Sequence, residues 1–219
     1  MKIAAFETAS EWCSVALWLD GEVRAAEARA GQRHGEFVLP MLEALLAQAR
    51  LATGDLQAVA FGAGPGSFTG LRIACGIAQG LAFARGLPAC GVSTLEALAE
   101  ESGASRVVAC LDARMGEVYY SALEKQGARW RAVVPAQCVP PARVPRPPGA
   151  GWIGCGSGFA AYGSMGFEVV YPEIHPGAAA VARLAAPRLA AGEGVDAARI
   201  APVYLRDKVA LTKEERRKR

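Results

Sequence analysis

A buried strand that ends in a carboxylate and then turns back as an antiparallel strand occurs twice in this sequence. The first copy covers residues 3–8 and 14–17 and ends its strand in Glu7. The second copy covers residues 108–113 and 120–123 and ends its strand in Asp112. Because a repeated unit predicts a repeated substructure, we expect two related lobes, residues 1–102 and residues 103–219.

The patterns between the two copies alternate between strand and helix after an opening three-stranded meander. This order predicts an α/β fold in which helices pack on a sheet. The expected strands are 2–7, 13–19, 23–30, 58–61 and 88–92, and the expected helices are 35–50, 69–85 and 94–101.

The second lobe is less regular. Strands are expected at 106–112 and 117–123, and a further strand near 152 enters a glycine-rich turn. Six prolines in residues 135–148 predict an extended surface connection rather than a helix or a central strand. An alanine-rich helix is expected at 177–191, bent or ended by Pro187.

The composition is that of a globular protein, with 52% hydrophobic and 21% charged residues. The longest apolar stretch, residues 73–84, is interrupted by glycines and is shorter than the ~20 residues that a bilayer requires. The N-terminus lacks the layout of a secretion signal, so we expect a cytoplasmic protein without a membrane segment. None of the six cysteines forms a C-x-x-C pair, which favours reduced and mostly buried thiols.

The net charge of +3 is concentrated at the C-terminus. Residues 206–219 contain seven lysines and arginines against three acidic residues. This basic tail has two interpretations, a segment that attracts phosphate groups and a solvated, frayed terminus.

A glycine-rich segment at residues 62–72 joins a buried strand to a helix. Helix N-termini in this position often hold anions, but the sequence lacks the spacing of a dinucleotide fingerprint, a Walker loop or a hydrolase elbow. The simplest interpretation is a tight turn capped by Ser67 or Thr69. Four glycines and a proline around Phe68 nevertheless exceed what a turn requires.

The same segment carries a family resemblance. Residues 64–73, GPGSFTGLRI, resemble the signature of the bacterial TsaB (YeaZ) family. Supporting matches follow in order along nearly the whole chain, at residues 6–18, at His34 ahead of Leu39-Pro40, and at 91–95, 112–119 and 202–206.

The resemblance implies a two-lobed fold of the actin/sugar-kinase/Hsp70 (ASKHA) type with duplicated mixed sheets. It also implies a role in forming N6-threonylcarbamoyladenosine on tRNA. In that family the partner TsaD performs the transfer, TsaB binds TsaD as an inactive sibling, TsaE engages the pair, and TsaC acts in the same pathway. No metal and no autonomously bound cofactor is expected, although a nucleotide could lie at the interface with TsaD.

Two departures from the family pattern affect the glycine-rich region. Glu7 replaces the family's usual Asp at the end of the first strand, and Ala74-Cys75 replaces the more common Gly-Ile. The longer side chain of Glu7 indicates either that this position has no catalytic role or that any nucleotide contact there is altered. The residues expected to contact a nucleotide or the partner are Glu7, Gly64, Pro65, Gly66, Ser67, Phe68, Thr69, Gly70 and Arg72.

Two helices are expected to form an apolar surface that binds TsaD, or a second copy of this chain when TsaD is absent. Apolar residues of the 36–50 helix sweep roughly 200°, about twice what one buried face needs. Small residues recur every four positions on the 69–85 helix, where glycine carries a helix penalty of ~1 kcal/mol. The alternative is that both helices are buried between the sheet and its neighbours. The expected interface residues are His34, Phe37, Val38, Met41, Leu42, Leu45, Gly76, Gly80 and Ala84.

The chain offers no recognisable catalytic arrangement. Its two histidines, His34 and His175, are far apart in sequence, and no Cys/His, Ser/His/Asp or paired-carboxylate pattern can be assembled. A non-catalytic subunit is therefore expected. The alternatives are a small ATPase or kinase that uses Glu7 and the glycine-rich loop, and a peptidase.

Overall fold

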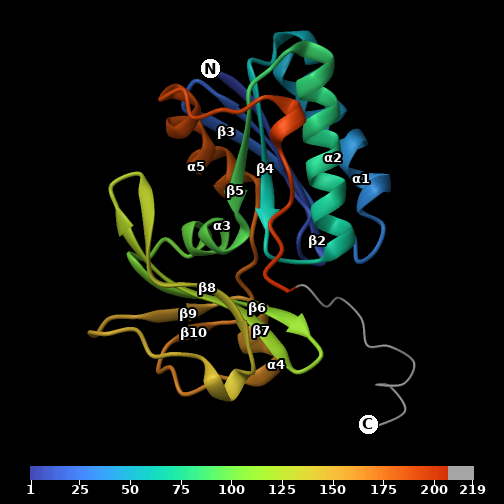
Figure 1. Cartoon of the computed structure of the whole chain (residues 1–219). Helices are drawn as coiled ribbons and strands as arrows, with labels where there is room; N and C mark the ends of the chain where they lie inside the picture. The colour runs from blue at the N-terminus through green and yellow to red at the C-terminus, as the bar shows by residue number, and fades with distance from the viewer. Residues whose placement is uncertain (207–219) are drawn as a thin grey trace.

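The computed structural model describes residues 1–206 and contains two five-stranded mixed sheets, one in each lobe (Figure 1). The basic tail predicted from the sequence lies, apart from Arg206, outside the described residues. Within residues 1–206 the structure contains no helix whose length and hydropathy would allow it to span a bilayer.

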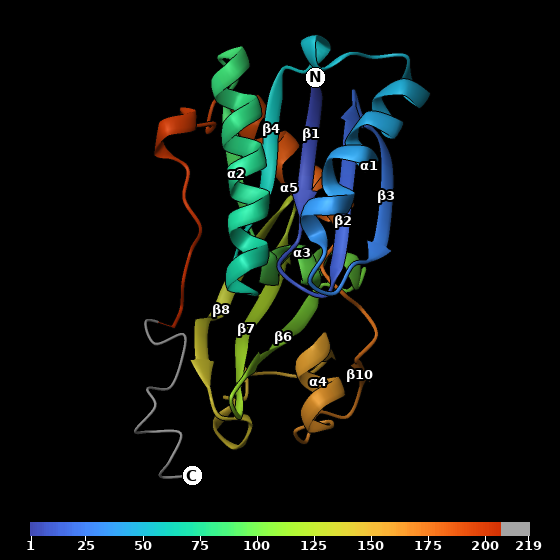
Figure 2. The same ribbon diagram turned by 90° about the vertical axis from the view of Figure 1, so that its right-hand side faces the viewer.

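The first sheet has the strand order β3-β2-β1-β4-β5. Strands β1, β2 and β3 form an antiparallel meander, whereas β4 and β5 add in parallel to β1. Helices α1 and α2 cover one face of this sheet (Figure 2). The elements are β1 (Lys2–Glu7), β2 (Trp12–Leu19), β3 (Glu22–Arg29), α1 (His34–Ala49), β4 (Ala58–Gly64), α2 (Phe68–Arg85), β5 (Ala89–Ser93) and α3 (Thr94–Glu101), with a short 3-10 helix at Thr53–Asp55.

The second sheet repeats this topology, because its order β8-β7-β6-β9-β10 has the same antiparallel and parallel pairs. The predicted duplication and the two-lobed ASKHA fold are thus confirmed. The elements are β6 (Arg106–Arg114), β7 (Glu117–Gln126), β8 (Arg129–Val139), β9 (Ile153–Cys155), α4 (Ser157–Tyr162), β10 (Val170–Tyr171) and α5 (Ala178–Ala190), with 3-10 helices at Pro141–Arg143 and Ala197–Arg199.

The proline-rich segment differs from its prediction. Strand β8 extends through Pro135 to Val139, so part of the expected connection is strand. Pro135 is tolerated because β8 is an edge strand whose register with β7 shifts near Ala122. The alanine-rich helix was expected to be bent or ended by Pro187. Helix α5 continues past Pro187 to Ala190, so the proline does not end it.

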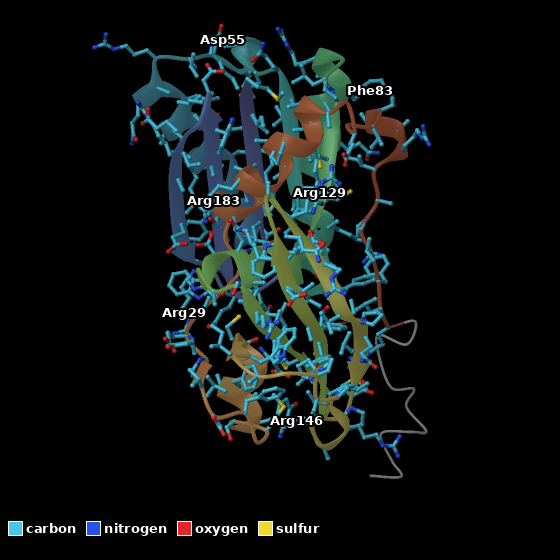
Figure 3. The ribbon with its side chains drawn as sticks, turned by 90° about the vertical axis from the view of Figure 1, so that its left-hand side faces the viewer. Arg29, Asp55, Phe83, Arg129, Arg146 and Arg183 are labelled. Atoms are coloured by element: carbon cyan, nitrogen blue, oxygen red, sulfur yellow. The ribbon has the colours of Figure 1, made fainter. Side chains whose placement is uncertain are left out.

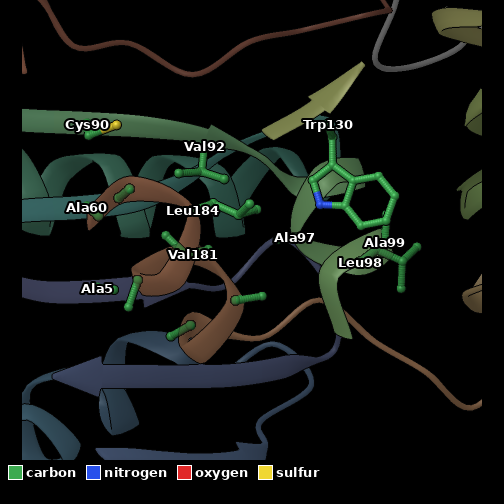
Figure 4. Packing of buried hydrophobic residues seen from close by; sticks show 14 of the residues in the cluster. Ala5, Ala60, Cys90, Val92, Ala97, Leu98, Ala99, Trp130, Val181 and Leu184 are labelled. Carbon is green, nitrogen blue, oxygen red and sulfur yellow. The ribbon is translucent and has the colours of Figure 1, made fainter. Parts of the chain in front are cut away.

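Helix α5 crosses from the second half of the chain to the first lobe. It packs on the face of the first sheet opposite α1 and α2, where Val181 and Leu184 lie near Ala5, Ala60 and Val92 (Figure 4). One continuous core therefore includes residues of both sheets, α3 and α5. The expected boundary at residues 102 and 103 falls between α3 and β6, but α5 lies against the first sheet.

The chain after α5 follows α2 back toward the second lobe (Figures 1 and 2). Val195 forms an antiparallel bridge with Ala89, and the Gln79 amide donates to the carbonyl of Ala197 at 2.9 Å. Further along, the Val203 N–H donates to the Ala63 carbonyl at 2.7 Å. We call residues 191–206 the C-terminal strap.

Candidate functional site

The glycine-rich loop lies between β4 and α2, directly over the turn that joins β1 to β2. Ser67 is the N-cap of α2, and its hydroxyl accepts from the Gly70 N–H at 3.3 Å. The capping role expected for Ser67 is thus confirmed, whereas Thr69 lies inside the first turn of the helix. The loop therefore begins a long helix, as its sequence indicated.

The loop packs against the β1–β2 turn backbone to backbone. The Ser67 N–H donates to the Ala9 carbonyl at 2.7 Å, and the Thr8 hydroxyl donates to the Gly70 carbonyl at 2.7 Å. A Cβ on Gly70 would collide with the Thr8 carbonyl, and one on Gly66 would lie 2.6 Å from Ala9. These glycines are required for close approach, and the N–H groups of Ser67 and Gly70 already have protein acceptors.

Gly64 meets a different part of the chain. It has φ +117°, and a Cβ there would lie 2.5 Å from the carbonyl oxygen of Val203. Its N–H donates to the Thr94 hydroxyl at 3.2 Å. The neighbouring Pro65 is buried. The loop thus joins α3, the β1–β2 turn and the C-terminal strap.

Glu7 lies fully buried at the end of β1 beneath this loop. Its carboxylate accepts from the Ala9 N–H at 2.7 Å and from the Thr94 hydroxyl at 3.4 Å, and Gly62 lies against it with no room for a Cβ. Burial raises the pKa of Glu7 from 4.5 to about 7, although these hydrogen bonds oppose the shift. The carboxyl group thus contacts Ala9 and, through Thr94, the glycine-rich loop.

Phe68 and Arg72, at the start of α2, form an exposed cluster with the C-terminal strap. The Arg72 guanidinium lies 3.2 Å from the ring centroid of Phe68 and 5.2 Å from that of Tyr204. The two rings are 5.5 Å apart, and Phe68, Tyr204 and Val203 are 42%, 41% and 52% exposed. We call Phe68, Arg72, Val203 and Tyr204 the aromatic–arginine surface.

Arg206 fastens the strap to the second lobe. Its guanidinium donates to the carbonyls of Ala113 and Arg114 at 2.9 and 3.3 Å and pairs with Glu117 at 2.5 Å. Residues 112–117 comprise the end of β6, the two turn residues Met115 and Gly116, and the start of β7. This anchoring role was missed in the sequence, where Arg206 is one of several basic residues near the C-terminus.

The residues expected at the α1–α2 interface divide into three groups by exposure. His34, Val38, Leu42 and Leu45 are buried in the core beneath α1, so their side chains do not form a surface. For these four, the alternative of burial against the sheet is correct, because the first sheet takes up this side of the wide apolar arc. Phe37 and Met41 are half-buried, whereas Gly76, Gly80 and Ala84 are exposed on α2.

The two histidines occupy unrelated positions. Burial lowers the pKa of His34 at the start of α1. The His175 ring stacks on Trp12 with centroids 4.3 Å apart and lies 3.3 Å from a Glu27 carboxylate oxygen. Within the described part of the chain, no three His, Cys, Asp or Glu side chains gather as a metal-binding group. All six cysteines are free and five are buried, as expected.

Comparisons with known proteins match both lobes. The family described as TsaD, tRNA N6-adenosine threonylcarbamoyltransferase, matches residues 27–201. The tRNA threonylcarbamoyladenosine biosynthesis protein TsaB of Escherichia coli (strain K12) is 39% identical over 97% of this chain and 98% of its own length. The Haemophilus influenzae protein of the same name is 34% identical over 97% of each chain. The solved structure of YeaZ from Pseudomonas aeruginosa has a TM-score of 0.88 and 39% identity, and the match covers 93% of this chain and 99% of that one.

Proposed function

This chain belongs to the TsaB (YeaZ) family, and we propose that it acts in forming N6-threonylcarbamoyladenosine on tRNA as a non-catalytic subunit that binds TsaD. In this proposal TsaD performs the transfer, TsaE joins the pair, and TsaC acts in the same cytoplasmic pathway. The chain pairs with a second copy of itself when TsaD is absent.

The exposed face of α2 carries the proposal. Gly76 and Gly80 lie in the helix interior, and a Cβ on either would meet no atom within 4 Å. Glycine in such a position costs ~1 kcal/mol relative to alanine. No contact within residues 1–206 explains why glycine rather than alanine stands at these two positions. Close approach of another protein's backbone is the physical reason that remains.

Both helices also carry exposed apolar side chains. Phe83 on α2 is 79% exposed, and Leu39 on α1 is 48% exposed. Phe83 lies at the end of the first lobe remote from the second (Figure 3). Exposed aromatic side chains beside small residues are typical of a protein interface, because removing such a side chain from water stabilises the complex. We therefore place the partner surface on the outer faces of both helices, with Leu39 in place of the buried Leu42.

The environment of the expected nucleotide residues supports a non-catalytic role. Glu7 is enclosed by the β1–β2 turn and Gly62, and the amides of Gly64, Ser67 and Gly70 donate to protein oxygens. An ATPase of this fold needs an acid and backbone donors that face its phosphates. Any nucleotide at this end of the chain is therefore proposed to require TsaD as the other wall.

Size-exclusion chromatography of the chain with TsaD tests the proposal. Gly80→Arg should abolish the complex, because a long cationic side chain would prevent close approach, while the monomer keeps its fold since the position is open. Ala160→Arg, at an exposed position on α4, is the matched control and should leave the complex intact. A Gly80→Arg chain that still elutes with TsaD would overturn the assignment of the surface.

Reconstitution tests the role itself. Removing this chain from a mixture of TsaC, TsaD, TsaE and unmodified tRNA should stop formation of the modified adenosine, and adding it back should restore formation. Modification that proceeds equally without the chain would overturn the proposed function. Calorimetric titration of the isolated chain with ATP and magnesium tests the ATPase alternative, which predicts strong binding and turnover.

A further inference from the structure

Helix α3 lies at the junction of the two lobes. Its Leu98 belongs to the core that both sheets share, in which Trp130 of β8 lies beside the helix (Figure 4). In the turn after β9, a Cβ on Gly156 would lie 2.6 Å from the Leu98 side chain. The thiol of Cys155 also lies 3.8 Å from the Leu98 carbonyl oxygen. The second lobe is therefore in close contact with α3.

Glu100 joins α3 to the hairpin formed by β7 and β8. One oxygen of its carboxylate accepts from the indole N–H of Trp130 at 2.8 Å and forms an ion pair with Lys125. The Glu100 side chain is only 13% exposed. Hydrogen bonds to a carboxylate that is shielded from water are stronger than those of an exposed ion pair. Glu100 thus holds α3 to the second lobe.

Glu96 and Glu101 join α3 to α5, which packs on the first sheet. Glu96 pairs with Arg188, and Glu101 pairs with Arg183 at 3.2 Å. The Glu101 carboxylate also accepts from the Ala180 N–H at 3.1 Å, in the first turn of α5. The three acids of α3 therefore connect the first sheet, through α5, with the second lobe.

The shared apolar core alone would not fix the orientation of the lobes. Apolar burial is non-directional, and packed elements can slide past one another in hinge and shear motions. A hydrogen bond to a carboxylate has a preferred geometry, and sliding would leave a partly buried charge without its partner. Glu96, Glu100 and Glu101 each add such a directional restraint at the same junction.

We propose that Glu96, Glu100 and Glu101 form an acidic lock that holds the two lobes in one relative orientation. Many two-lobed proteins close around a ligand by a hinge motion, and the acidic lock opposes that motion. The chain then behaves as one rigid body, which suits a subunit that presents a fixed surface to a partner. The lock acts within the isolated chain and does not depend on TsaD.

Pulsed electron paramagnetic resonance of the full-length chain tests the acidic lock. Spin labels are attached through Glu43→Cys on α1 and Ala160→Cys on α4, which are exposed positions in different lobes. The background variant Cys138→Ser removes the half-buried cysteine, since the other five native cysteines are buried. The labelled chain with an intact lock should give a single narrow distribution of distances between the labels.

A triple variant, Glu96→Ala with Glu100→Ala and Glu101→Ala, removes the acidic lock while alanine preserves the helix. Its distance distribution should be at least about twice as wide, because the hinge is then free to move. Glu100→Ala alone should widen the distribution less, and it decides the question if circular dichroism shows that the triple variant is unfolded. The matched control is Glu11→Ala, which breaks an exposed ion pair with Arg29 inside the first lobe and should leave the distribution unchanged.

Three outcomes would overturn the acidic lock: a broad distribution with the lock intact, a folded triple variant with a distribution as narrow as the intact chain, or equal widening in Glu11→Ala. The unlabelled triple variant is also run with TsaD on size-exclusion chromatography. It should still form the complex, because the proposed TsaD surface lies on α1 and α2. Failure of the wild-type chain to bind TsaD would count against the proposed function alone, because the distance measurement needs no partner.

Discussion

Replacing Glu7 with glutamine should change how the stability of the protein depends on pH. The Glu7 carboxyl is fully buried, and burial raises its pKa from 4.5 to about 7. The folded protein therefore binds this proton more tightly than the unfolded chain does. The resulting stability is complete below about pH 4.5 and is lost as the pH rises through about 7.

The magnitude follows from the two pKa values. Ionising Glu7 in the folded state lowers the free energy of unfolding by about 3 kcal/mol at high pH, of which about 2.5 kcal/mol is lost between pH 5 and pH 8. Glutamine stays neutral over this range, and its amide oxygen can accept the Ala9 N–H as Glu7 does. The variant should therefore gain about 2.5 kcal/mol relative to wild type between pH 5 and pH 8.

Thermal unfolding of both proteins at half-unit steps from pH 5 to pH 8.5 measures this difference. For a chain of this size it corresponds to roughly 5–10 °C in the relative Tm. Burial lowers the pKa of His34, so its own contribution is lost as the pH falls, but that contribution is common to both proteins and cancels. Exposed Glu168→Gln is the control. A gap between wild type and Glu7→Gln that stays constant with pH would refute the reasoning.

Four further substitutions test the packing. Gly70→Ala should destabilise the chain by about 2–4 kcal/mol in urea unfolding, because the added Cβ would collide with the Thr8 carbonyl. Gly76→Ala should stabilise the isolated chain by up to about 1 kcal/mol, because a Cβ there meets no other atom. Equal effects of the two substitutions would contradict the environments assigned to the two glycines. Leu42→Ala should cost about 2–5 kcal/mol in the same assay, since Leu42 is a core residue, and a loss below ~0.5 kcal/mol would place it at the surface. Arg206→Gln should cost about 2–3 kcal/mol and speed hydrogen exchange in the C-terminal strap, and unchanged exchange would show that the anchor is elsewhere.

Local sequence patterns were sufficient for most elements of the first lobe. Its strands and helices carry strong apolar periodicity, and Ser67 marks the start of α2 by a capping mechanism that depends only on neighbouring residues. The duplication was also visible, because each lobe repeats a strand with an acid near its end. Glu7 is the last residue of β1, and Asp112 lies two residues before the end of β6 at Arg114. These signals are local and therefore readable without the fold.

The remaining features depend on contacts between distant residues. The breadth of the apolar arc on α1 does not reveal that Leu42 faces the sheet rather than a partner. Similarly, nothing near α5 in the sequence indicates that this helix belongs against the first sheet. Arg206 acquires its role only when the strap brings it to Glu117. Pro135 argued against a strand, and only the position of β8 at a sheet edge makes it acceptable.

The return of α5 to the first sheet has a consequence for biosynthesis. When residues 1–102 leave the ribosome, the sheet face that contains Ala5, Ala60 and Val92 has no cover, because the helix that will shield it has not been translated. The whole second lobe must be made before that face is closed. Folding of the N-terminal half is therefore completed last, and a nascent chain stalled or cut before residue 178 presents an apolar sheet face that promotes aggregation.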